Sequence, residues 1–150
     1  MKLLSAICGG IAGACALTLI HQVLKSVDGD APRMDLLGME AISLGLKKAD
    51  QDIPSRETLY GVTMAGDLVS NSLYYSLVGA GRKKRAIYRG AALGLAAGIG
   101  GVLLPKPLGL HPEFSSRTPK TAILTVALYL TGGFVAGAVS RLLEEKERNL

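Results

Sequence analysis

An uninterrupted apolar run near the start of the chain places the strongest constraint on its fold. Residues 3–24 contain no charged side chain, and about 20 apolar residues are what a helix needs to cross the hydrocarbon core of a bilayer. The run also extends beyond the usual length of a secretory signal core, so we expect an uncleaved anchor rather than a signal peptide. The chain is therefore expected to fold in a membrane.

Three more apolar blocks follow, at residues 59–80, 86–104 and 121–142, and they leave external loops at residues 25–58 and 105–120. The second block is the weakest, because a central acid such as Asp67 costs about 2.5–3.5 kcal/mol on membrane insertion scales. Taken together, the blocks predict an all-α integral membrane protein. We expect residues 1–150 to form a single transmembrane domain, a four-helix transmembrane bundle.

Small residues recur every four positions within these blocks. The chain has 19 glycines and no tryptophan, and only 5% of its residues are aromatic. Such spacing lets helix backbones approach closely in lipid, where small residues favour association. The rows predict tight Gly-rich packing, either within the chain or between copies, so we expect a homo-oligomer or a larger membrane complex. The glycines concerned are Gly9, Gly13, Gly90, Gly94, Gly98, Gly133 and Gly137.

A dense basic turn indicates the orientation of the bundle. Arg82, Lys83, Lys84 and Arg85, with Arg89, place five positive charges within eight residues. On the opposite side of the predicted bundle, eight positive residues are matched by eight acidic ones. Positive charge next to a span favours the cytoplasmic side. We therefore expect a multi-pass protein of a bacterial inner membrane, with both termini in the cytoplasm and the basic residues near anionic lipid.

The two external loops are expected to differ in structure. Residues 34–46 carry a broad apolar stripe with Glu40, Ser43 and Lys47 on one face, which is typical of a helix that lies in the membrane interface. Residues 105–120 contain four prolines. Because proline fixes φ and removes a backbone donor, we expect that second loop to be rigid and extended rather than helical.

An intramembrane polar group is the main candidate for function. Asp67 and Asn71 lie on one stripe of the second block. Counting about 1.5 Å per residue inward from the external surface places Thr18, Gly98 and Tyr129 near the depth of Asp67, with His21 closer to the surface. Two interpretations stay open. Asp67 is either a buried acid bonded to Thr18, Tyr129 or nearby backbone, or a protonation site or ion ligand on a pathway.

The sequence limits the function classes without selecting one. It contains no GxSxG, HExxH or phosphate-binding glycine loop, and His111 and Glu113 lack the further ligands that a metal site needs. We expect no metal, no cofactor and no nucleic-acid partner. The leading hypothesis is a non-enzymatic structural or accessory subunit in the lipid bilayer. The alternative is a small transporter or channel, for an unidentified ion or solute, that uses Asp67 and Asn71. A membrane enzyme ranks third.

Overall fold

The computed structural model describes residues 2–148, and helices dominate that part of the chain. Helix accounts for 81% of the structure, and no strand occurs among the described residues, which confirms the all-α prediction. Two 3-10 turns, η1 and η2, connect α3 to α4. The elements are α1 (Lys2–Val27), α2 (Met34–Lys48), α3 (Arg56–Ser76), η1 (Leu77–Gly79), η2 (Lys83–Arg85), α4 (Ala86–Leu103), α5 (Glu113–Ser116) and α6 (Pro119–Arg148).

Three of the described helices are long and apolar enough to cross a membrane. They are α1, α4 and α6, with mean hydropathies of 2.1, 1.4 and 1.9 over their most apolar windows. These helices suggest a membrane protein. The second predicted span forms α3, but α3 does not belong to this group. Asp67 and a run of hydroxyl and amide side chains make it more polar than the other three long helices.

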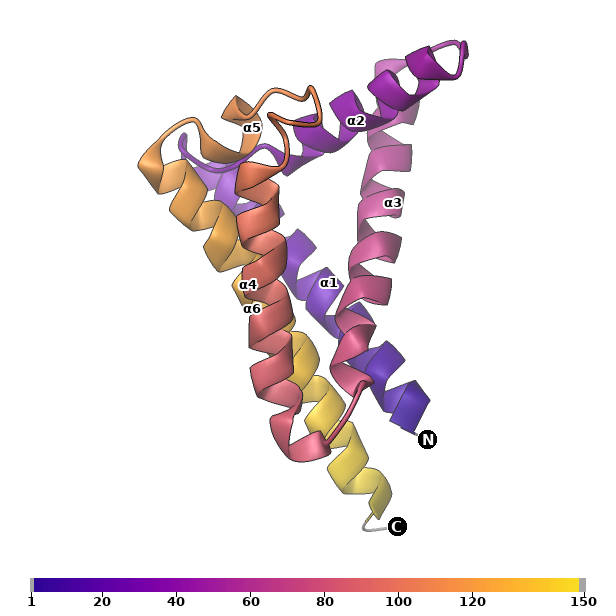
Figure 1. The fold of residues 1–150 in the computed structure, drawn as a ribbon, viewed down its shortest axis with the longest axis vertical. Coiled ribbons are helices and arrows are strands. Elements are labelled where there is room, and N and C mark those ends of the chain that lie inside the picture. Colours follow the sequence, from indigo (N-terminus) through magenta and orange to yellow (C-terminus); the bar gives the residue numbers. More distant parts are fainter. Residues whose placement is uncertain (1, 149–150) are drawn as a thin grey trace.

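The long helices are arranged around α6 (Figure 1). α6 lies between α1 and α4 and packs extensively against both, whereas α3 packs mainly on α1 and meets α4 at few points. α2 crosses the upper end of the molecule in Figure 1, close to α5, and both ends of the chain lie at the lower end. This arrangement separates α3 from α4 even though only a short turn joins them.

Many large hydrophobic side chains lie on the surface of the molecule. Exposed large hydrophobic residues occur along every long helix, such as Leu19 on α1, Val69 on α3 and Ile123 on α6. Extensive exposed apolar surface marks a contact with a partner or a membrane, so this distribution suits a surface that faces lipid. The buried polar side chains are Ser5, His21, Asp35, Thr63, Asn71, Ser115, Thr121, Thr125 and Ser140.

Glycine rows set the spacing between α4 and α6. Gly90, Gly94 and Gly98 are all buried against α6. A Cβ atom at Gly98 would lie 2.7 Å from the Cα of Val126, and one at Gly137 would lie 2.6 Å from the carbonyl oxygen of Ala86. Backbone atoms at such distances leave no room for a side chain, so the two helices touch main chain to main chain.

The other two glycines of the predicted rows hold α1 against α6. A Cβ atom at Gly9 would lie 2.6 Å from the carbonyl oxygen of Ala136, and one at Gly13 would lie 2.5 Å from that of Gly132. All seven predicted glycines therefore contact other helices of the same chain, which agrees with tight packing within the chain. The expected homo-oligomer or larger membrane complex stays a prediction.

The loops agree with the prediction in one case and differ in the other. The first contains the predicted helix, α2. The second is not extended: its backbone turns at Pro105, where the Leu110 amide donates to the Pro105 carbonyl at 2.9 Å, and it then forms α5. Pro112 directly precedes α5 and Pro119 opens α6. Proline is tolerated at a helix start, where its missing N–H has no partner to lose.

Candidate functional site

A cleft between α3 and α4 is the best candidate for a functional site. Its volume is about 610 Å³, and it opens because α3 leans on α1 rather than on α4. No charged residue lines it. The α4 wall consists of small residues, and Leu37 and the start of the second external loop close the upper end. The side walls of the cleft include Ser70, Asn71, Tyr74, Ala96, Ala97 and Tyr129.

Hydrogen bonds close the cleft toward the basic turn. The Tyr74 hydroxyl donates to the carbonyl oxygen of Leu93 on α4 at 2.9 Å. Below it, the Arg89 guanidinium donates to the carbonyl oxygen of Val78 at 2.9 and 2.5 Å and to that of Arg82 at 2.9 Å. Arg89 therefore satisfies backbone groups that the end of α3 leaves open. The cleft therefore does not continue as a passage to the end of the molecule that carries the basic turn.

Asp67 lies beside this cleft and is bonded on its own helix. The Asn71 amide donates to the Asp67 carboxylate at 2.9 Å, an i,i+4 pair on α3. Of the partners considered for a locally bonded Asp67, Thr18 is excluded, because its hydroxyl is buried without a hydrogen-bond partner. The partner that Asp67 has is Asn71, which the sequence placed on the same stripe. Electrostatic interactions with His21 and Tyr129 still place Asp67 near both.

Polar groups of α1 continue from this region toward the outer end. His21 is bonded to the carbonyl oxygen of Pro32 at 2.9 Å, which ties α1 to the start of α2. Gln22 donates to the Tyr60 hydroxyl at 3.3 Å and so bridges α1 and α3. The sequence gave no sign of the contact between Gln22 and Tyr60, because it depends on which helix lies next to α1.

Two ion pairs on the buried Asp35, above these residues, were not predicted from the sequence. Lys25 and Arg33 both bond Asp35, at 3.0 and 3.1 Å. Burial alone would raise the pKa of Asp35, but the hydrogen bonds from Arg33 and Lys25 outweigh it and lower the pKa to about 2. A sequence signal existed, because Asp35 follows Arg33 closely in the first turn of an apolar helix.

The two external loops are tied to each other above the cleft. The His111 amide donates to the Glu40 carboxylate at 2.9 Å, and the His111 ring pairs with the same carboxylate, which raises the pKa of His111. The Arg33 amide donates to the carbonyl oxygen of Phe114 at 2.7 Å. These bonds hold α2 across the upper end of the bundle, where it covers the cleft.

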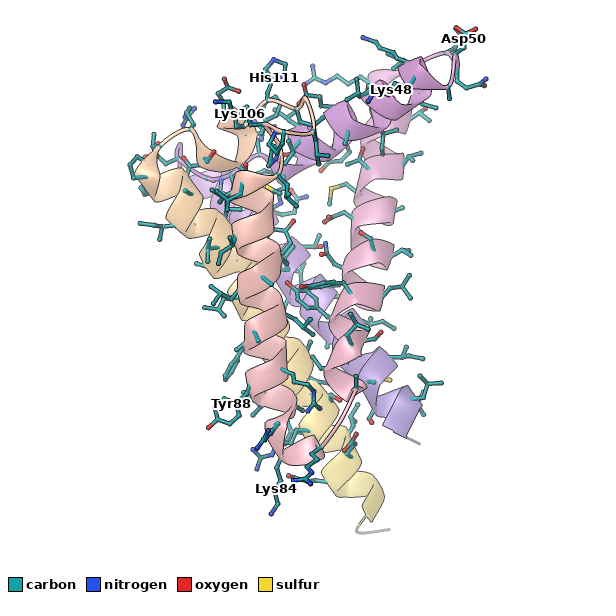
Figure 2. All side chains as sticks on the ribbon, in the orientation of Figure 1. Lys48, Asp50, Lys84, Tyr88, Lys106 and His111 are labelled. Atoms are coloured by element: carbon teal, nitrogen blue, oxygen red, sulfur yellow. The ribbon has the colours of Figure 1, made fainter. Side chains whose placement is uncertain are left out.

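The predicted orientation residues lie together at the other end. Arg82, Lys84 and Arg85 are exposed in the turn between α3 and α4, and the side chain of Lys83 lies outside the described part of the structure. Figure 2 shows Lys84 and Tyr88 at this end, with His111, Lys106, Lys48 and Asp50 at the opposite end. The charged side chains at both ends of the molecule are thus separated by the long apolar helices.

Comparisons with known proteins add no assignment to this geometry. Among the described residues, no group of three or more His, Cys, Asp or Glu side chains is placed to hold a metal ion. No family model, no curated protein and no solved structure matches the chain. The function has to be argued from the cleft and its surroundings.

Proposed function

We propose that the chain is a multi-pass membrane protein in which α3 is a fourth span. Chain direction supports this proposal: α1 runs from the lower to the upper end in Figure 1, and α4 starts again from the lower end. If α1 and α4 both cross a bilayer, residues 28–85 must cross it in the opposite direction. α3 has 21 residues, which is about 31 Å of helix and enough to span the hydrocarbon core.

The packing of α3 lowers the free-energy cost of placing its polar residues in a membrane. Asp67 shares a hydrogen bond with Asn71, and Asn71 is 8% exposed. The exposed side chains of α3 include Val62, Val69 and Leu73, which suit contact with lipid. A polar group in a span is tolerated when it faces the protein interior or a cavity. The basic turn then lies in the cytoplasm with both termini, by the positive-inside rule, as in a bacterial inner membrane.

In this proposal the protein is a non-enzymatic accessory protein. Its function is to bind an uncharged amphipathic molecule, which enters the α3–α4 cleft from the bilayer. One observation carries the proposal: a cleft of about 610 Å³ with apolar walls and a few hydrogen-bonding groups. Ligand sites in proteins have this size and composition, and the spaces between helices of a bundle are common places for them.

The residues that line the cleft also restrict the chemistry of the ligand. Ser70 and Asn71 offer neutral donors and acceptors, and no cation or carboxylate reaches the cleft surface. A charged head group would enter this space without a counter-ion, which is costly away from water. A hydroxyl, ester or ketone group on an apolar body fits the lining better.

Transport of a small solute is the second candidate. The polar groups His21, Gln22 and Lys25, which lead from the depth of Asp67 to the outer end of α1, favour it. The closure of the cleft by Tyr74 and Arg89 favours binding over passage. For this reason the binding role ranks first.

Replacing Ala97 with leucine tests the binding role. Ala97 lines the cleft, so the larger side chain should fill it and reduce photolabelling by a diazirine-bearing long-chain alcohol at least about fivefold, since a lost apolar contact of about 1 kcal/mol has this effect. Ala65→Leu is the matched control, because Ala65 is an exposed residue of α3. Equal labelling of both variants and the native protein would contradict the proposal. Solute flux that Asp67→Asn abolishes in a folded protein would favour transport instead.

A further inference from the structure

A second pocket, separate from the cleft, lies where the outer ends of three helices meet. It lies between the end of α1, the start of α2 and the first turns of α3, and its volume is about 610 Å³. Leu36 and Met39 form an apolar wall. The remaining lining residues are Lys25, Arg33, Asp35, Arg56, Glu57 and Tyr60.

The charges around this pocket leave a positive excess. Asp35 is buried, and its carboxylate is bonded by both Lys25 and Arg33, so this group of three side chains carries one net positive charge. Arg56 and Glu57 lie next to each other on α3 and offset each other. The pocket therefore presents three cations, one from each helix or its cap, against two acids.

Several hydrogen-bond donors in the pocket are not used by other groups of the protein and can bind a ligand. The Arg33 guanidinium uses Nε and Nη2 for Asp35, so its Nη1 edge makes no bond to any described residue. The Arg56 side chain likewise forms no hydrogen bond or ion pair with any residue whose side chain the structure describes. The Tyr60 hydroxyl accepts from Gln22 at 3.3 Å, so its own hydrogen can be donated.

We propose that this pocket binds the phosphate group of a membrane phospholipid. Phosphate oxygens accept several hydrogen bonds at once, and the planar guanidinium group matches them with paired donors. The donors stand at the outer helix ends, where lipid head groups lie if α1 and α3 span the bilayer. The inference rests on the proposed membrane location and not on the cleft.

The apolar wall favours a lipid over free phosphate as the source of this group. Leu36 and Met39 would contact the glycerol and the upper acyl chain of a phospholipid, whereas inorganic phosphate gains nothing from them. Lys25 also lies over the ring of Tyr60, 5.9 Å from its centroid, which keeps its ammonium group at the mouth of the pocket.

Lipid binding by the purified full chain tests the proposal. Native mass spectrometry would measure retention of phosphatidylglycerol, of diacylglycerol with the same chains, and of inorganic phosphate. We expect Arg56→Gln to weaken phosphatidylglycerol binding about tenfold, the effect of losing one charge-assisted bond. Arg56→Lys should recover part of the loss, because it keeps the charge without the paired donors. Lys106→Gln is the matched control, since Lys106 is exposed at the same end and lies outside the pocket (Figure 2).

Each outcome of that experiment decides the proposal. Preference for phosphatidylglycerol over diacylglycerol in the native protein and in Lys106→Gln, lost in Arg56→Gln, supports it. Displacement of the phospholipid by low millimolar inorganic phosphate would retain the phosphate site but overturn the lipid as its source. Equal retention of both lipids, or unchanged binding by a folded Arg56→Gln protein, would overturn the site itself.

Discussion

Replacing Gly133 with isoleucine is expected to force α4 away from α6 and to lower the free energy of unfolding by about 3 kcal/mol, the upper end of the usual range for overpacking. A Cβ atom at Gly133 would lie 2.9 Å from both the Cα and the amide nitrogen of Gly94 and would also contact the carbonyl oxygen of Gly90. These are backbone atoms, so no side-chain rotation can relieve the clash. The helices themselves would have to separate.

Gly66→Ile is the control for this substitution. Gly66 is an exposed glycine of α3, and nothing lies within 4 Å of a Cβ atom built on it. Unfolding of the purified protein in mixed detergent micelles, followed by circular dichroism, would give both free energies. Gly66→Ile should stay close to the native value. If Gly133→Ile unfolds no more readily than Gly66→Ile, the α4–α6 contact described here is incorrect.

Neutralising Asp35 is expected to lower the free energy of unfolding by about 2 kcal/mol at neutral pH. In the folded protein, Asp35 is buried and bonded by Arg33 and Lys25, and its pKa falls from the ordinary value of 3.8 to about 2. A difference of nearly two pKa units corresponds to about 2 kcal/mol of stability when the carboxyl group is ionised. Asp35→Asn removes this charge and leaves two cations near each other.

The contribution of Asp35 has a defined pH dependence. Because the folded pKa is lower than the unfolded one, the stabilisation is complete above about pH 5 and is lost as the pH falls through about 2. Urea unfolding at pH 7 and at pH 2.5 would measure the change. The gap between the native protein and Asp35→Asn should shrink at the lower pH. Asp52→Asn, at an exposed position, should show no gap at either pH. A gap for Asp35→Asn that persists unchanged at low pH would contradict this account.

The helices and their tight contacts could be predicted because their signals are local. The charge-free run at residues 3–24 lies within α1, and the Gly90, Gly94 and Gly98 row occupies the face of α4 that meets α6. Adjacent glycines of α6 meet different helices: Gly132 faces Tyr75 of α3 and Gly13 of α1, whereas Gly133 faces α4.

The surroundings of Asp67 could not be predicted from the sequence. Counting residues predicts the depth of a side chain along its helix, and on this basis the sequence predicts a similar depth for Asp67, Thr18 and Tyr129. Counting residues does not show which helices are neighbours in the bundle. That is decided by the glycine contacts that bring α1, α6 and α4 together and leave α3 on α1. The cleft follows from this arrangement, and no local pattern predicts it.

The central claim is that the chain crosses the membrane four times, with α3 as the return span. Cysteine labelling tests it most directly. After Cys8 and Cys15 are replaced with alanine, Lys48→Cys and Lys84→Cys place single thiols at opposite ends of α3 (Figure 2). In intact cells, an impermeant maleimide is expected to label Lys48→Cys at once and Lys84→Cys only after the membrane is permeabilised. Labelling of both positions from the same side would contradict a membrane-spanning α3.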